Sequence, residues 1–204
     1  MFMPSSVSAA PVDDAAETSF SVIGDIQVDV GQEVSTEDLE EVGVPPEVAA
    51  NLVEGINDVP STGSKSVSPT LYGPTAPLSA QASFGRVGWT WKDHKNRTVV
   101  LRTAINHKIV TKHNASWKVA RTTTKYPKTT GVEGSARKYF TPVHNVRCTG
   151  YGVFRSCRSI GSVTVKTVVE FMKVRRDGKP RGVITAYCLK HPKCPNYVKN
   201  AVNV

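Results

Sequence analysis

Four cysteines stand in the last third of the chain, and they limit how that part of the protein can fold. An even number of cysteines allows three pairings. We favour Cys148–Cys157, because the segment between them holds two glycines that suit a tight loop, and Cys188–Cys194, because Pro192 favours a turn between them. Bridges that close loops this short stabilise a fold by about 2–3 kcal/mol each.

A metal site is the competing interpretation of the same residues. Cys188, His191 and Cys194 are three residues apart, so that a cation is conceivable there. Zinc sites usually take ligands in pairs separated by two to four residues, and Cys148 and Cys157 do not fit that pattern. Neighbouring lysines would also repel a divalent cation. We therefore expect disulfides formed in an oxidising compartment, no metal and no cofactor.

Charge divides the chain into two unlike parts. Residues 1–83 hold thirteen acids and one base, a net charge of −12, whereas residues 84–204 hold twenty-five bases and four acids, a net charge of +21. The whole chain carries +9. A segment at +21 attracts polyanions, and that attraction weakens as salt is added.

Composition predicts four segments. Val7-Ser8-Ala9 matches the small-residue pattern before a signal-peptidase cut, but no basic and apolar stretch stands before it in the chain. We expect a secreted protein, and no apolar run is long enough for a transmembrane helix. The expected segments are a residual export-signal end (1–10), an acidic N-terminal extension (11–58), a Pro/Ser/Thr/Gly-rich linker (59–83) and a basic, disulfide-stapled β domain (84–204).

The acidic extension is expected to be partly helical or disordered. Thr18–Val30 suggests a short strand. Ser35 or Thr36 would cap a helix that ends at Gly43, and Pro45-Pro46 would start a second one.

The basic part has the pattern of a small antiparallel β domain, so the fold class is mainly β, α+β overall. Short strands are expected at Val87–Trp91 and Thr98–Thr103, with a return strand at Lys108–Lys112. Ser116–Thr124 is ambiguous between strand and helix, and Tyr126–Val143 has the composition of a loop.

The strongest local signal is a hairpin. Ser162–Val174 and Arg181–Cys188 flank Asp177-Gly178, a pair typical of two-residue hairpin turns. That turn would place Phe171 opposite Ile184 and give the hairpin one apolar face.

We expect two clusters of basic side chains to bind anions. In the first, between residues 89 and 97, bases follow two tryptophans. In the second, between residues 175 and 181, bases crowd the turn of the hairpin. In the competing interpretation, the tryptophans form a core face and the charged turn is simply solvated. The candidate binding residues are Trp89, Trp91, Lys92, Lys95, Arg97, Arg175, Arg176, Lys179 and Arg181.

A nuclease is the catalytic alternative, because phosphodiester cleavage needs a general acid, a general base and a cation. Its candidate residues are His107, His113, His144 and Glu133. No motif joins these side chains, so we assign no catalytic residue and favour a non-catalytic role, with the enzyme as the open alternative.

The sequence thus predicts a secreted non-catalytic binding module. Its partner would be an anionic envelope polymer (teichoic acid), nucleic acid, an anionic lipid surface or an acidic secreted protein in a complex where the module acts as an adaptor. The chain's own acidic extension is a further possible partner, either as a mask or as a docking arm. The runner-up is a secreted basic toxin or ribonuclease masked by an acidic propeptide.

Overall fold

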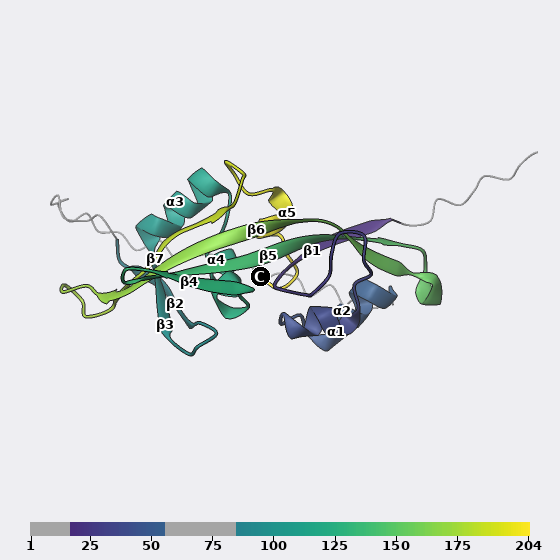
Figure 1. Cartoon of the computed structure of the whole chain (residues 1–204), viewed down its shortest axis with the longest axis horizontal. Helices are drawn as coiled ribbons and strands as arrows, with labels where there is room; N and C mark the ends of the chain where they lie inside the picture. Colours follow the sequence, from purple (N-terminus) through teal and green to yellow (C-terminus); the bar gives the residue numbers. More distant parts are fainter. Residues whose placement is uncertain (1–16, 56–84) are drawn as a thin grey trace, which may run out of the picture.

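The structure is a computed structural model that describes residues 17–55 and 85–204 (Figure 1). The described part is mostly antiparallel β with short helices, as predicted. The expected export-signal end (1–10) and linker (59–83) lie outside it. Its elements are β1 (Thr18–Ile23), α1 (Thr36–Glu41), α2 (Pro46–Glu54), β2 (Val87–Lys92), β3 (Thr98–Arg102), α3 (Thr103–His113), α4 (Trp117–Lys125), β4 (Thr129–Glu133), β5 (Ala136–Thr149), the 3-10 turn η1 (Gly152–Phe154), β6 (Ser156–Lys173), β7 (Pro180–Cys188) and α5 (Asn196–Lys199).

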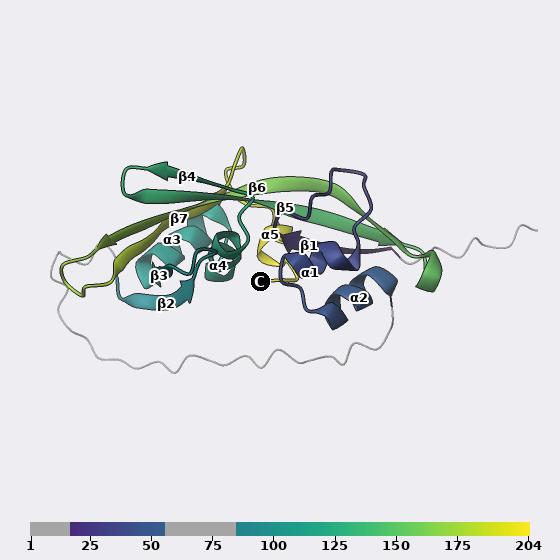
Figure 2. The same cartoon turned by 60° about the horizontal axis from the view of Figure 1, so that its bottom comes forward.

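A long ribbon of β5 and β6 forms the centre of the main sheet. In the described chain this sheet has the strand order β1-β5-β6-β7, and β4 also pairs with β5. Because β6 occupies one edge of β5, β1 and β4 follow each other along the other edge. The helices and the β2–β3 hairpin lie on one side of this curled sheet (Figure 2).

The larger core fills the space between the sheet and the elements beneath β5–β7. Alternate residues of the ribbon, such as Tyr139, Val143 and Val165, are fully buried there, as the period of two in a strand requires. Helices α3 and α4 contribute Ile109 and Val119, which are also fully buried. The β2–β3 hairpin closes this core from below.

The acidic segment builds a second core on the other half of the ribbon. Strand β1 pairs with β5 from Thr18 opposite Cys148 to Ile23 opposite Val143. Leu39 of α1 is fully buried in the same cluster. The described part of the expected extension is therefore packed onto the basic domain, whereas the division of the chain at residues 58 and 84 stays a prediction.

The helices of this segment begin and end close to the residues that the sequence indicates. Ser35 caps α1 in a reciprocal capping box with Asp38. Gly43 follows that helix with φ +83°, and Gly55 ends α2 in the left-handed conformation.

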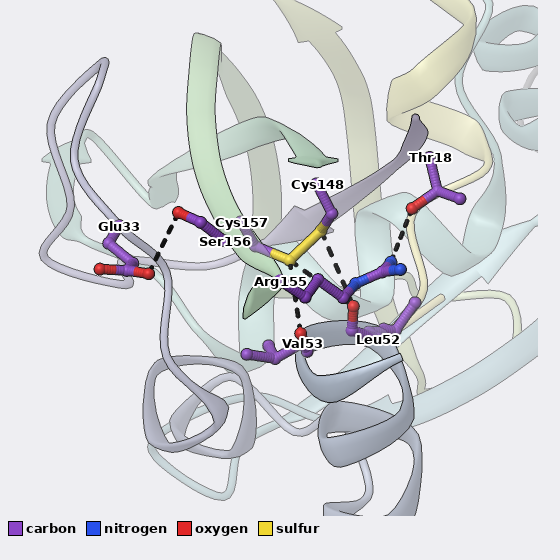
Figure 3. The surroundings of a disulfide bond; sticks show 8 residues. All are labelled: Thr18, Glu33, Leu52, Val53, Cys148, Arg155, Ser156 and Cys157. Atoms are coloured by element: carbon purple, nitrogen blue, oxygen red, sulfur yellow. Dashed lines mark hydrogen bonds between the residues drawn. A yellow bond between two sulfur atoms is a disulfide. The ribbon is translucent and has the colours of Figure 1, made fainter. Parts of the chain in front are cut away.

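Both predicted disulfides are present, and the described residues contain no free cysteine. Cys148 and Cys157 stand directly opposite each other on β5 and β6, where their bridge rests on the last turn of α2 (Figure 3). The Cys188–Cys194 bridge ties the end of β7 to the segment before α5, and the amide of Cys194 donates to the carbonyl of His113.

Two expectations for the middle of the chain are wrong. Lys108–Lys112 lies within helix α3, because this segment docks its one fully buried residue, Ile109, beside β7. Tyr126–Val143 is not a loop, because it contains β4 and most of β5, joined at Gly134 with φ +58°. The ambiguous Ser116–Thr124 is helix α4, capped by the Ser116 hydroxyl.

The hairpin exists, but its turn is wider than two residues. The amide of Val174 donates to Lys179 at 2.8 Å, and the pairing shifts by two residues from the predicted one. Because the register shifts by an even number of residues, the shift by itself keeps each side chain on the face of the hairpin that was predicted for it. A bulge then leaves Ile184 without an opposite residue and turns Val183 into the core, with 1% of its surface exposed. A salt bridge from buried Arg102 to Asp177 holds the wide turn in place.

The contact between the first bridge and α2 gives a prediction. Replacing Cys148 and Cys157 together by serine lowers the free energy of unfolding by about 2–3 kcal/mol in equilibrium urea denaturation. Amide exchange in α2 also accelerates, because the Sγ atoms of both cysteines meet the Leu52 carbonyl. The matched control is the double serine variant of Cys188 and Cys194, in which α2 keeps its protection. Equal loss of α2 protection in both variants would show that the contact with the Cys148–Cys157 bridge is not what protects α2.

Candidate functional site

An open groove of about 450 Å³ runs between strand β2 and helix α4. Its lining combines three tryptophans, three bases and one threonine. These residues are Trp89, Thr90, Trp91, Lys92, Trp117, Arg121 and Lys125.

Tryptophan side chains from the two elements form the floor. Trp89 and Trp91 share a face of β2 because they are two residues apart. Trp91 is 8% exposed, and its indole nitrogen donates to the Thr124 hydroxyl at 2.8 Å, which fixes β2 against α4. Trp89 is half-buried and stacks on Trp117 with ring centroids 5.8 Å apart and an angle of 18°.

Basic side chains line the groove from both sides. Lys92 and Arg121 are exposed, and Lys125 is half-buried. Arg121 and Lys125 stand four residues apart on α4, so they lie on the same face of the helix. None of the described residues that line the groove is acidic. The groove therefore offers uncompensated positive charge beside aromatic surface.

A second hollow of about 300 Å³ borders the other side of α4. Arg121 and Lys125 line it too, together with Lys118. Gly43 and Pro45 of the acidic segment form part of its wall, but neither is charged. The described acidic segment thus reaches α4 without contributing a carboxylate to either hollow.

The remaining candidates of the first predicted cluster have different surroundings. Lys95 is exposed in the β2–β3 turn. The guanidinium of Arg97 forms a 2.8 Å salt bridge with Asp93 and a 3.0 Å hydrogen bond with the Tyr139 hydroxyl, and it covers the ring of Phe171 at 4.8 Å. Arg97 is therefore engaged inside the fold.

Asp93 is the centre of this network. Burial would raise its pKa, but hydrogen bonds from Tyr139 and Arg97 outweigh burial and hold the pKa of Asp93 below its ordinary value. Burial, with the Asp93 carboxylate next to it, raises the pKa of Tyr139. The network keeps the β2–β3 turn fixed beside the groove.

The second predicted cluster lies elsewhere. Its bases are all exposed in or next to the β6–β7 turn: Arg175, Arg176, Lys179 and Arg181. Arg102 of β3 binds this turn and pairs with Val87, whereas Lys92 stands at the other end of β2. The six residues of β2 span up to about 20 Å, so the two clusters are separate surfaces.

Within the part of the chain that the structure describes, no hydrogen bond, ion pair or ring contact joins the four residues of the nuclease alternative. His107 and His113 lie on α3, where His113 contacts the ring of Tyr187. Glu133 pairs with Lys138 at the β4–β5 hairpin. His144 lies on β5 beneath the segment that follows β1. The described residues also hold no cluster of three or more His, Cys, Asp or Glu side chains that suits a metal ion.

His144 is nevertheless unusual. It is 6% exposed, and neither ring nitrogen has a hydrogen-bond partner within the protein. It lines a cavity of about 390 Å³ together with Asp25, Asp29 and Lys128. Burial lowers the pKa of His144, although Asp25 acts in the opposite direction.

Sequence reasoning missed three of the groove residues: Trp117, Arg121 and Lys125. They follow at intervals of four, which is a helical spacing. The signal was Ser116, a good N-cap residue placed directly before Trp117. Treating this segment as a helix would have brought the three side chains onto one face.

No family model, curated protein or solved structure matches the chain. None of the described helices combines the length and the apolar character that a bilayer crossing requires.

Two histidines, buried His144 and half-buried His113, predict an acid-sensitive fold. Burial lowers the pKa of His144, and burial with two nearby lysines lowers that of His113. The unfolded chain therefore binds more protons below about pH 6.5, so stability is lost as the pH falls from there toward the lowered folded values. Urea denaturation should show a loss of up to about 1.4 kcal/mol per pH unit for each histidine.

His144→Gln removes its share of this dependence and flattens the stability curve between about pH 6.5 and pH 5. His191→Gln, at an exposed position in the Cys188–Cys194 loop, is the matched control and leaves the curve unchanged. A His144→Gln curve as steep as that of the unmodified protein would disprove this explanation.

Proposed function

We propose that this protein is a non-catalytic extracellular module that binds an anionic polymer with a phosphodiester backbone in the β2–α4 groove. One observation carries the proposal: Lys92, Arg121 and Lys125 flank a stacked pair of tryptophans in an open groove whose described lining holds no acid.

Each part of the groove has a role in such binding. The basic side chains neutralise phosphates and release counterions, which supplies most of the affinity for a polyanion. Arg121 offers a planar fork of donors that matches two phosphate oxygens at once. The partly exposed faces of Trp89 and Trp117 offer a surface on which sugar or base rings lie flat.

The disulfides support a location outside the reducing cytosol, where such bridges form and persist. Phosphodiester polymers available there are wall teichoic acids and released nucleic acid, which share the chemistry that the groove recognises. An acidic secreted protein is the competing occupant, in which case the module is an adaptor. A ribonuclease would use the same groove and cut its ligand.

A salt titration of binding provides the first test. We expect the full chain to bind a purified poly(glycerol phosphate) teichoic acid and a single-stranded oligonucleotide, with log affinity falling against log salt at a slope of about −2 to −3. That slope corresponds to three phosphate contacts. Fluorescence anisotropy of the labelled ligands measures the affinity for each of them at each salt concentration. A clearly higher affinity for the oligonucleotide than for the teichoic acid at the same salt concentration would identify nucleic acid as the preferred source.

Arg121→Ser with Lys125→Ser should reduce the affinity at least about tenfold and lower the salt slope by about 1–2. Lys190→Ser with Lys193→Ser is the matched control, since it removes the same charge from the Cys188–Cys194 loop, which does not line the groove. Equal losses in both variants would show non-specific attraction and reject the groove. Cleavage of the oligonucleotide would establish the nuclease, and binding that is saturable only with an acidic protein would establish the adaptor.

A further inference from the structure

The loop at the far end of the β5–β6 ribbon exposes two aromatic side chains. Phe154 is 87% exposed and Tyr151 is 60% exposed. The loop projects from the end of the molecule away from β2 and α4, at the right of Figure 1. A single exposed apolar side chain is ordinary, but two aromatic side chains exposed together at the end of a projecting loop mark a candidate contact surface.

This loop is held rigidly. The Cys148–Cys157 bridge closes its base, and the amides of Phe154 and Arg155 donate to Tyr151 and Gly152 within it. Gly150 adopts φ +88°, and any Cβ there would collide with the carbonyl of Phe154.

Contacts with the acidic segment add a further restraint (Figure 3). The Arg155 guanidinium donates to the Thr18 hydroxyl at 2.6 Å, and the Ser156 hydroxyl donates to Glu33 at 3.2 Å. The aromatic tip is thus presented in a fixed arrangement, so that binding through it costs little conformational entropy.

Two arginines stand directly below the tip. Arg147 and Arg158 occupy opposite positions on β5 and β6, and both are exposed. Like charges placed opposite each other across two strands destabilise the pair. Glu17 pairs with Arg147 at 2.7 Å, whereas no ion pair to Arg158 is found in residues 17–55 and 85–204. An anion with several phosphate oxygens would relieve the repulsion between the two guanidinium groups.

We propose that this end of the ribbon contacts an anionic lipid surface, with Phe154 and Tyr151 entering the headgroup layer and Arg147 and Arg158 meeting lipid phosphates. Aromatic side chains beside bases are suited to the boundary between headgroups and acyl chains. A convex tip fits a deformable lipid layer, whereas docking to a protein requires a pocket of matching shape.

The nearby carboxylates of Glu17 and Glu33 weaken the electrostatic attraction. The aromatic tip therefore supplies the larger share of the binding. This contact is independent of the β2–α4 groove, and it needs no polymer bound there.

The test uses the full chain and sedimenting vesicles of phosphatidylcholine, with or without phosphatidylglycerol. We expect retention on the anionic vesicles, weaker retention on the neutral ones, and a loss of at least about tenfold in partitioning for Phe154→Ala. Arg158→Ser should lower retention about fivefold on the anionic vesicles alone. Phe154→Trp should retain binding, and its extra emission should shift to shorter wavelength on vesicles.

Met172→Ala is the matched control, because Met172 is also an exposed apolar side chain, at 63%, but lies at the opposite end of β6. It should bind as the unmodified protein does. Arg121→Ser with Lys125→Ser should also bind vesicles normally, which separates this proposal from the groove. No retention of the unmodified protein, or equal retention of Phe154→Ala, overturns the proposal. Tip-dependent capture of a protein in place of vesicles would overturn it in favour of a protein contact.

Discussion

The pairing of β5 with β6 is the interaction on which the rest of the structure depends. These strands are 14 and 18 residues long, and every other strand of the main sheet pairs with one of them. Odd-numbered residues of β5, such as Tyr139 and Val143, enter the larger core, whereas even-numbered Val146 and Cys148 enter the second, and the register shifts between the two sets where Ile160 of β6 has no opposite residue. One ribbon thereby carries two cores, and the Cys148–Cys157 bridge secures the end that the smaller core covers.

Apolar contacts and strand pairing, more than ion pairs, hold the acidic segment in place. Residues 17–55 contain ten acids and no base, yet in the described chain only Asp25 and Glu17 form salt bridges with the basic part. Asn203 adds a clamp, because its side-chain amide bonds with Ile23 and the Val42 carbonyl. Surface ion pairs contribute little to stability. The acids thus remain largely solvated, and the bases of α4 keep their charge available for a ligand.

Local signals in the sequence predicted local features well. The disulfide partners, the Ser35 cap and the alternation of β2 each depend on residues close together in the chain. Features set by distant contacts were missed. Helix α3 has one fully buried residue and a β-branched composition, so only its docking beside β7 decides its conformation. The hairpin register likewise depends on Arg102, which is 75 residues from Asp177.

The candidate groove likewise combines a part that depends on local sequence with a part that depends on distant contacts. Its β2 half was predicted from aromatic and basic residues in one short strand, whereas its α4 half needed a helix that brings Trp117 beside Trp89. The two proposed contacts then lie toward opposite ends of a sheet whose longest strand spans up to about 60 Å. Two weak attachments on one rigid body reinforce each other, because the first raises the effective concentration of the second. A ribbon with the proposed polymer site toward one end and the proposed lipid contact at the other would be suited to hold a polymer close to a membrane.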